Sequence, residues 1–316
     1  MGGDILVSAC IITYNQEKYI AQAIESVINQ KCDFKFELII GEDCSKDSTR
    51  AIVAEYAAKY PDIIVPIFQD KNQGATLNFN TCLMRSRGKY FSALEGDDYW
   101  TDPYKLQRQF DFMEANPEFS LCFGECDVID EMGGKGPDIF PAVTKDEFTF
   151  EDIVMMEKGF VPTATTFSKN LLPRPLPKFF IDALSGDIAS YLLLADKGKF
   201  RYLPGKVAVY RDHSGGITKN PEQIKLGYGR LFKLYLDANE YFGYKYDKIF
   251  KKRFSEMSKI NLIYGSRDIK GFKKLKYVSQ NAPDYFKYSD TLSVKEVVYY
   301  FTVLFMPFLV KRRSEP

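Results

Sequence analysis

Four short apolar runs alternate with segments of helical spacing over the first hundred residues, and this pattern limits the fold more than any other feature of the sequence. Each run is continuously apolar, as a strand covered on both faces requires. Strands that alternate with helices form a parallel, doubly wound sheet. The predicted strands are residues 5–12, 36–40, 63–68 and 90–94, and the predicted helices are residues 17–30 and 48–60 and a segment ending near residue 85.

The fourth run ends in three acidic residues, Glu95, Asp97 and Asp98, and a helix capped by Thr101 or Asp102 is expected just beyond. Ligands of open α/β sheets bind outside the carboxyl ends of the strands. Carboxylates gathered there repel one another, whereas Mg²⁺ or Mn²⁺ takes one or two of them together with phosphates and water. The turn is therefore either an acidic helix cap or a divalent-cation site.

The first predicted turn excludes two common nucleotide-binding motifs. The segment TYNQEK has no glycine, as a GxGxxG turn would need, and GxxxxGK[ST] does not occur in the chain. A bound diphosphate would need another counter-charge, and a cation at Asp97 and Asp98 would supply it. Asn15 and Asp43 follow the first and second runs and are expected to line the same crevice.

Two further segments carry residues suited to catalysis. Asp187, in ALSGDIASYLLLADKG, is either the N-cap of a helix or a general base, since a carboxylate within about 3 Å can take the proton of a reacting hydroxyl. Arg211 and His213 precede a glycine pair in VAVYRDHSGGIT. His213 is the only histidine, and it is either a structural residue or a partner for a cation already held by carboxylates.

Four linked blocks resemble the nucleotide-sugar-binding half of the family 2 glycosyltransferases, which have the GT-A fold. The resemblance implies that Asp98 ligates the metal, that Asp97 lies near the ribose and that Asp43 reads the base, with Thr13 and Asn15 at the edge of the same pocket. The blocks are VSACIITYNQEKYIAQAIESVINQ, ELIIGEDCSKDSTRAI, NQGATLNFN and GKYFSALEGDDYWTDPYKLQ.

The same resemblance assigns roles outside the acidic turn. It implies that Asn78 lies near the diphosphate and that Asp187 is the general base. Arg211 would be a phosphate clamp and His213 a metal or phosphate contact, with residues 214–218 as a mobile lid.

The implied fold is α/β, a GT-A (Rossmann-like) mixed but mostly parallel sheet with flanking helices and a C-terminal helical region. The implied enzyme is inverting and uses Mn²⁺ or Mg²⁺. It moves one sugar from a nucleoside-diphosphate sugar, UDP by default, to a saccharide or lipid-linked acceptor in bacterial polysaccharide synthesis, without nucleic acid. The only tryptophan is Trp100, so the QxxRW motif of processive synthases is absent. A sugar nucleotidyltransferase and a non-catalytic nucleotide-sugar-binding membrane scaffold are the alternatives.

Beyond residue 119 the alternation is lost. We expect short strands at residues 120–123 and 127–129 and a short helix at residues 148–156. Residues 172–180 contain three prolines and are expected to form no helix.

Charge separates two parts of the chain. Residues 221–316 hold 19 basic and 10 acidic residues, whereas residues 1–220 hold 24 and 32. We predict a catalytic domain over residues 1–220, divided into a nucleotide-sugar half (1–130) and an acceptor half (131–220), and a basic helical region over residues 221–316.

The segment 297–310 has 14 residues without a charge. It is shorter than the ~20 residues that span a bilayer, so it is either a core helix or a peripheral membrane contact. No signal-peptide pattern opens the chain, and the six cysteines fit reduced thiols. The sequence thus predicts a cytoplasmic protein, either free or peripheral at the inner face of the plasma membrane.

Overall fold

The computed structural model describes residues 4–156, 161–183, 186–216 and 221–265, with Lys287 and Thr302 singly, and of residues 221–228 and 259–265 it describes the backbone alone. The chain divides into two compact units, Met1–Gly227 and Tyr228–Pro316, and each is described by itself. The predicted boundary at residue 220 falls on a residue outside the described ones.

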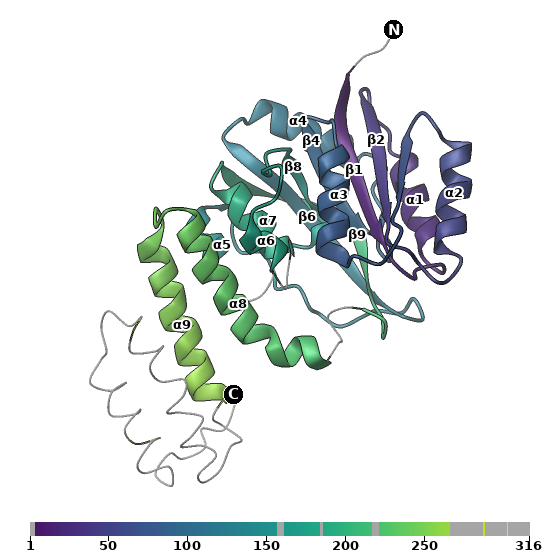
Figure 1. Cartoon of the computed structure of the whole chain (residues 1–316). Coiled ribbons are helices and arrows are strands. Elements are labelled where there is room, and N and C mark those ends of the chain that lie inside the picture. The colour runs from purple at the N-terminus through teal and green to yellow at the C-terminus, as the bar shows by residue number, and fades with distance from the viewer. Residues whose placement is uncertain are drawn as a thin grey trace. The chain divides into compact units, whose positions relative to one another are not determined.

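A nine-stranded mixed sheet forms the centre of the first unit (Figure 1). Its strands are β1 (Ile5–Thr13), β2 (Lys35–Glu42), β3 (Ile64–Phe68), β4 (Tyr90–Glu95), β5 (Tyr99–Trp100), β6 (Phe119–Asp130), β7 (Glu147–Phe148), β8 (Phe167–Lys169) and β9 (Lys199–Asp212). They are arranged in the order β3-β2-β1-β4-β8-β6-β9-β5, and β7 pairs with β9. The pairs among β1 to β4 are parallel, whereas β8 is antiparallel to both of its neighbours. This confirms the predicted mixed α/β sheet.

Helices cover both faces of this sheet. The crossover helices α1 (Ile20–Ile28) and α2 (Thr49–Lys59) pack on one face, because both connections step in the same direction along the sheet. The connection from β3 to β4 steps back across β2 and β1, so its helix α3 (Ala75–Arg85) covers the opposite face (Figure 1). The remaining short elements of this unit are α4 (Lys105–Ala115), α5 (Phe150–Val154), α6 (Lys178–Ile181), α7 (Gly186–Ala195) and the 3₁₀ helix η1 (Thr163–Thr165).

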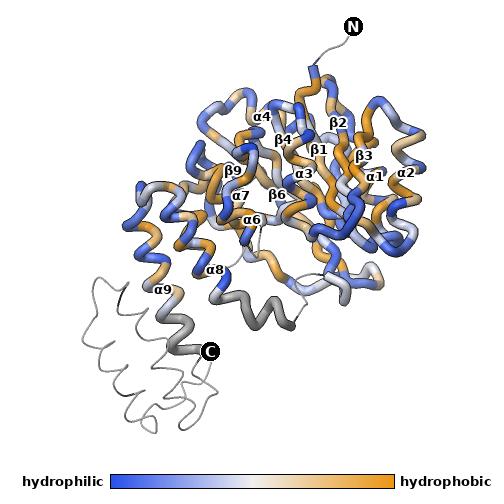
Figure 2. The backbone as a smooth tube through the Cα atoms, viewed as in Figure 1, coloured by the Kyte–Doolittle hydropathy of each residue, from blue (hydrophilic) through white to orange (hydrophobic). Residues whose placement is uncertain are grey.

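The main core lies between the sheet and α1, α2 and α4. Val7, Ala9 and Ile11 alternate along β1 and are fully buried against apolar side chains of α1, including Ile20 and Ile24. Figure 2 shows the strands largely in the hydrophobic colour and the loops at the sheet edges largely in the hydrophilic colour. The periodicity that predicts strands and helices in the first hundred residues thus corresponds to real buried faces.

Three expectations for the elements are wrong. The two short strands expected at 120–123 and 127–129 are one strand, β6, whose register with β9 shifts between Phe123 and Cys126. The proline-rich segment includes a four-residue helix, α6, which begins directly after Pro177. Helix α4 begins at Lys105 with Tyr104 at its N-cap, whereas Asp102 accepts a hydrogen bond from the Tyr104 N–H at 3.0 Å.

The carboxyl ends of β1, β2 and β4 lie side by side. Thr13 is the register partner of Glu42, and Ile12 is the partner of Glu95. The turns after β2 and β4 each begin with a hydrogen bond to β1. The N–H of Asp43 donates to the Thr13 carbonyl and the N–H of Gly96 donates to the Ile12 carbonyl, both at 3.0 Å. The predicted crevice is therefore one edge of the sheet.

The second unit begins within α8 (Pro221–Tyr241) and continues with α9 (Asp247–Gly265). Tyr235 of α8 and Phe250 and Phe254 of α9 are almost fully buried. Among the described helices, none combines the length and the apolar character needed to cross a membrane. Of the segment 297–310, only Thr302 is among the described residues.

Candidate active site

An acidic turn joins β4 to β5 at the carboxyl edge of the sheet. Its glycine, Gly96, lies directly on the end of β1, because a Cβ at this position would stand 2.5 Å from Gln16 Oε1 and 2.8 Å from Thr13 Oγ1. The Thr13 hydroxyl donates to Gln16 Oε1 at 2.7 Å. Thr13 therefore forms the floor under the turn, and a side chain larger than hydrogen at residue 96 would lift the turn from that floor.

Asp98 is the buried member of the turn, with 2% of its surface exposed. Its Oδ1 accepts a hydrogen bond from the Arg211 N–H at 2.9 Å, and its Oδ2 accepts none from the described residues. Burial, and then the Asp97 carboxylate, raise the pKa of Asp98 well above the ordinary value, and Arg211 opposes the rise. This carboxylate thus lacks a full counter-charge, and its Oδ2 has no hydrogen-bond donor among the described residues.

Asp97 and His213, predicted from two different motifs, lie in contact. Asp97 Oδ2 is 3.0 Å from His213 Nε2, and the Tyr19 ring is 5.2 Å from the imidazole. The hydrogen bond to Asp97 raises the pKa of His213. Arg211, at the end of β9, donates from Nη1 to the Asp97 carbonyl at 2.8 Å.

Asp187 lies in the first turn of α7, and its carboxylate is hydrogen-bonded to the Thr163 hydroxyl. The residue is exposed, yet the surrounding protein atoms raise the pKa of its carboxyl, an effect that water moderates. Burial, and then the carboxylates of Asp98, Asp187 and Asp97, raise the pKa of Glu95 well above its ordinary value. Asp187 is therefore within electrostatic reach of the acidic turn, although about 90 residues separate them in sequence.

Three residues of this cluster are assigned no role in the sequence analysis. Glu95 has a buried Oε2 without a hydrogen-bond partner among the described residues. Thr163 bonds both Asp187 and Tyr191, and the Tyr191 hydroxyl donates to the Val161 carbonyl at 3.2 Å. The position of Glu95 at the end of the fourth run was a usable signal, whereas no sequence pattern marks Thr163 or Tyr191.

Asp43 supports a neighbouring loop. Its two carboxylate oxygens accept the N–H groups of Gln73 and Gly74, each at 2.8 Å, and only 2% of its surface is exposed. Asn15 has a φ of 54° and accepts the Lys46 N–H at 2.8 Å. Both residues shape the loops beside the predicted nucleotide pocket, and their contacts with a base remain predictions.

Asn78 lies beneath this edge, on α3, with 1% of its surface exposed. Its amide nitrogen donates to the Gly41 carbonyl at 2.7 Å, and its oxygen accepts from Gln69 at 3.3 Å. These bonds tie α3 to β2. The predicted contact of Asn78 with a diphosphate stays a prediction, and the amide already has two protein partners.

The acidic turn fits a hard divalent cation in its donor chemistry. Neither Glu95 Oε2 nor Asp98 Oδ2 accepts a hydrogen bond from the described residues, and burial together with neighbouring carboxylates raises the pKa of both side chains. The described residues contain no cluster of three or more His, Cys, Asp or Glu arranged to hold a metal alone. Mg²⁺ is commonly held by one or two carboxylates together with substrate phosphates, so two protein oxygens are sufficient.

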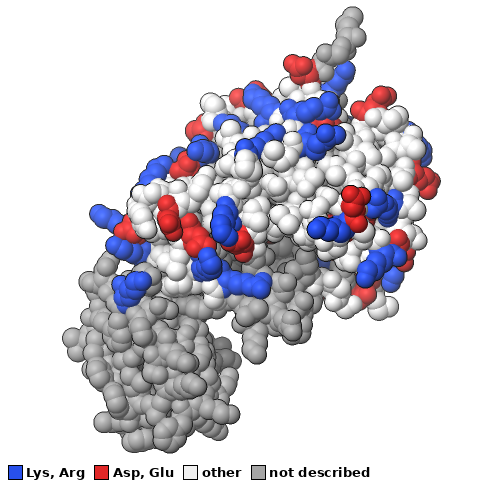
Figure 3. Space-filling view, in the orientation of Figure 1, with Lys and Arg blue, Asp and Glu red and all other residues white. Residues whose placement is uncertain are grey.

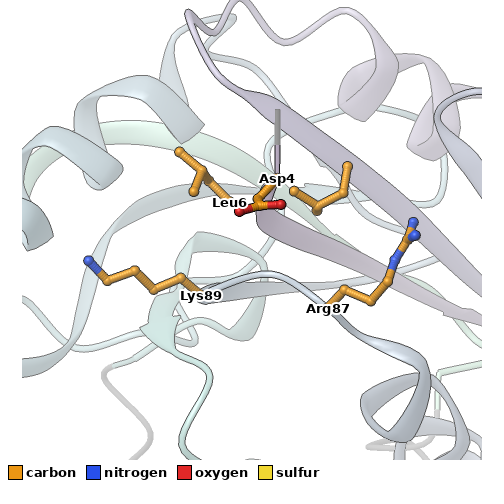
Figure 4. A pocket seen from close by; sticks show the side chains of 5 residues that line it. Asp4, Leu6, Arg87 and Lys89 are labelled. Carbon is orange, nitrogen blue, oxygen red and sulfur yellow. The ribbon is translucent and has the colours of Figure 1, made fainter. Parts of the chain in front are cut away.

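Two pockets are lined by residues outside the acidic turn. One, of about 560 Å³, lies at the opposite end of β1 and is lined by Asp4, Leu6, Arg87 and Lys89 (Figure 4). Arg87 pairs there with Glu37 at 2.7 Å, and none of the lining residues belongs to the acidic turn.

A second pocket, of about 350 Å³, lies between the end of β6 and the loop that follows, and Cys126 is among its lining residues. Burial, and then Asp98, raise the pKa of the Cys126 thiol to about 12. This pocket is therefore within electrostatic reach of the acidic turn.

The part of the chain that forms the acidic turn matches a known protein family. Residues 8–148 match the model described as Glycosyl transferase family 2. Over these 141 of its 316 residues the chain is similar to that family. The match contains β1 to β6 and the whole acidic turn.

Two curated relatives extend the similarity beyond the matched region. A protein of Mycobacterium tuberculosis, described as uncharacterized, is 36% identical over 214 residues, which are 67% of this chain and 60% of that protein. The GalNAc(5)-diNAcBac-PP-undecaprenol beta-1,3-glucosyltransferase of Campylobacter jejuni is 27% identical over 240 residues, or 72% of this chain and 73% of that enzyme. The chain thus spans about three fifths of the length of the mycobacterial relative.

Solved structures confirm the GT-A fold. Staphylococcus aureus TarS 1–349 in complex with UDP-GlcNAc has a TM-score of 0.52 at 16% identity, covering 95% of this chain and 80% of that one. The mannosyltransferase PcManGT of Pyrobaculum calidifontis, in complex with GDP-Man and Mn²⁺, has a TM-score of 0.55 at 13% identity, with coverages of 96% and 81%. At these identities the likeness establishes the fold alone.

Proposed function

We propose that this protein is a metal-dependent, inverting glycosyltransferase that moves one sugar from a nucleoside-diphosphate sugar to an acceptor hydroxyl. The observation that carries the proposal is the position of Asp187 within electrostatic reach of the acidic turn. A transferase of this kind needs both a place for the donor diphosphate and a base for the acceptor, and this edge of the sheet offers both.

The acidic turn is the proposed donor site. Asp98 and His213 would hold Mn²⁺ or Mg²⁺, and Asp97 would contact the donor near its ribose. When bound, the cation would neutralise negative charge on the diphosphate leaving group. Thr13, Asn15 and the remaining loops at this edge would enclose the nucleotide.

Asp187 is the proposed general base. Its carboxylate would accept the proton of the acceptor hydroxyl while the oxygen attacks the anomeric carbon from the side opposite the diphosphate. The raised pKa favours this role, since a base is more effective when its proton affinity is higher than that of an ordinary exposed aspartate. Thr163 fixes the direction in which the carboxylate points.

The donor and acceptor classes are also part of the proposal. TarS was solved with UDP-GlcNAc, which supports a UDP-sugar, and the Campylobacter jejuni relative is named for an undecaprenol-linked acceptor. We therefore favour a saccharide or lipid-linked acceptor in bacterial polysaccharide synthesis. The basic region 221–316 would bring the enzyme to the inner face of the membrane, where such an acceptor is anchored.

Two variants separate the two halves of the site. Binding of UDP, with and without Mn²⁺, would be measured by calorimetry, and transfer would be followed as release of UDP. We expect D98N to weaken Mn²⁺-dependent UDP binding at least ~10-fold, as loss of a metal ligand or its close partner does. D187N should bind UDP normally and lose transfer ~10²- to 10⁴-fold.

The exposed Asp62 provides a matched control, because D62N removes the same charge away from the site. Metal-independent binding that D98N leaves intact would refute the metal-dependent donor site. Release of pyrophosphate in place of UDP would indicate a nucleotidyltransferase.

A further inference from the structure

The guanidinium of Arg211 is already occupied by protein partners. Nη1 donates to the Asp97 carbonyl at 2.8 Å, and Nη2 donates to Gln22 Oε1 at 2.5 Å. The rings of Tyr19 and Tyr99 each lie 4.8 Å from the guanidinium carbon. Two of the five guanidinium N–H groups thus donate to protein acceptors.

The same residue holds both aspartates of the acidic turn, through different atoms. Its main-chain N–H donates to Asp98 Oδ1 at 2.9 Å, while its side chain holds the Asp97 carbonyl. The Asp98 bond orients one carboxylate oxygen and leaves Oδ2 directed elsewhere. Pairing of Tyr99 with Val209, two residues before Arg211, brings the turn and the strand end together.

A third segment takes part through the start of α1. Gln22 is exposed on that helix and accepts from the guanidinium, and Tyr19 lies at its N-cap. Tyr19 also lies against His213, which in turn pairs with Asp97. The end of β9, the acidic turn and the start of α1 are thus linked through one side chain.

We infer that Arg211 is a positioning residue, which holds the Asp97–Asp98 turn in its ligand-binding geometry, and that it is not a ligand of the donor diphosphate. This assignment replaces the phosphate clamp expected from the sequence. It rests on the proposed function for the identity of the ligand, but not for the contacts themselves. Residues that orient metal ligands lower metal affinity about 10- to 100-fold when they are changed.

The first test needs no ligand. His213 is the only histidine, so its ring gives a single set of carbon-bound proton signals in the NMR spectrum of the full chain. R211K and R211M should both shift these signals, because Asp97 and Tyr19, the neighbours of His213, are held by the guanidinium fork. An unchanged His213 spectrum in both variants would overturn the inference.

The second test separates positioning from phosphate binding. UDP titrations at a series of Mn²⁺ concentrations should show that R211K and R211M raise the Mn²⁺ concentration for half-maximal binding about 10-fold. UDP affinity at saturating Mn²⁺ should change less than about threefold, since no phosphate contact is lost. The inference would be overturned if R211M lost UDP affinity even at saturating Mn²⁺ while R211K kept it. That result would show that Arg211 binds the phosphate directly.

A milder variant guards against loss of folding. Q22M removes only the acceptor of Nη2 from an exposed position and leaves Arg211 in place. The inference predicts a smaller shift of the same His213 signals, whereas a free phosphate clamp predicts none. If the native protein binds no UDP with Mn²⁺, the proposed function fails, while the ligand-free spectra still decide the role of Arg211.

Discussion

The Asp187 carboxylate accepts a hydrogen bond from Thr163, and this bond opposes the rise in pKa that the surrounding protein atoms cause. A general base acts in its ionised form, so activity should be lost as the pH falls through its pKa. T163V removes the hydroxyl at nearly constant shape and lets the pKa of Asp187 rise further. We expect the acid limb of the kcat/KM profile to move to higher pH, with roughly tenfold lower activity at the acid end.

The serine variant is the matched control for this measurement. T163S keeps the hydroxyl, so its acid limb should stay near that of the native enzyme. If T163V lowers activity equally at every pH, the hydroxyl serves the fold of η1 and does not tune the base.

At the residue scale, the sequence predicts functional groups that follow strand ends and helix starts. Asp97, Asp98 and Asp187 stand at such points, and the carboxylates of all three raise the pKa of Glu95. It could not predict the contacts of Arg211, because an arginine near carboxylates is compatible with binding either protein or phosphate. The bond from Arg211 to Gln22 of α1 supports the inference that this arginine binds protein.

Helix α4 is joined to the sheet by a buried lysine. Lys105 has none of its surface exposed, and its Nζ contacts Ser92 Oγ on β4 at 2.9 Å and the Thr166 carbonyl at 3.2 Å. It also lies 4.2 Å from the centre of the Trp100 ring. Burial lowers the pKa of Lys105 to about 7.

This lysine should make stability depend on pH. An unfolded lysine has a pKa near 10.4, so between about pH 7 and 10 the unfolded chain holds more protons and the free energy of unfolding rises with pH. We expect this contribution to be roughly 1 kcal/mol per pH unit in the native protein and absent in K105M. Urea unfolding of both proteins at pH 7.0 and 8.5 measures it, and equal pH slopes would contradict it.

At the element scale, periodicity fails where pairing partners are distant. Nothing near Gly124 in the sequence shows that β6 continues, because the shifts in its register are accommodated by β9, about 80 residues later. No sequence pattern predicts the three-residue strand β8, because antiparallel pairing with β4 and β6 determines its position. Local patterns describe β1 to β4 well because each strand there is paired with a neighbour in the same repeating unit.

At the scale of the whole molecule, the distribution of charge is uneven along the chain. On the face seen in Figure 3, the described residues show both signs interspersed. The basic excess belongs to residues 221–316, with 19 basic and 10 acidic residues. Clusters of basic residues bind anionic lipid surfaces, with a strength that falls as salt rises.

The full chain should therefore co-sediment with vesicles that contain anionic lipid. An increase in salt from about 0.05 to about 0.5 M should release it, because salt screens the attraction between the basic residues and the lipid. Replacing Lys311, Arg312 and Arg313 by glutamine should weaken this binding. K206Q, a single change on β9, serves as the control. Equal binding to neutral vesicles would argue against the electrostatic contact.

The acidic turn is completed by a residue that the ribosome adds much later. Asp98 and Arg211 are 113 residues apart, and β6, β8 and α7 are all made between them. A nascent chain that has reached residue 150 contains the whole region matched by the family, yet the strand that secures its turn does not exist. Translation that stops before β9 would thus yield a chain with a recognisable motif and an unassembled site.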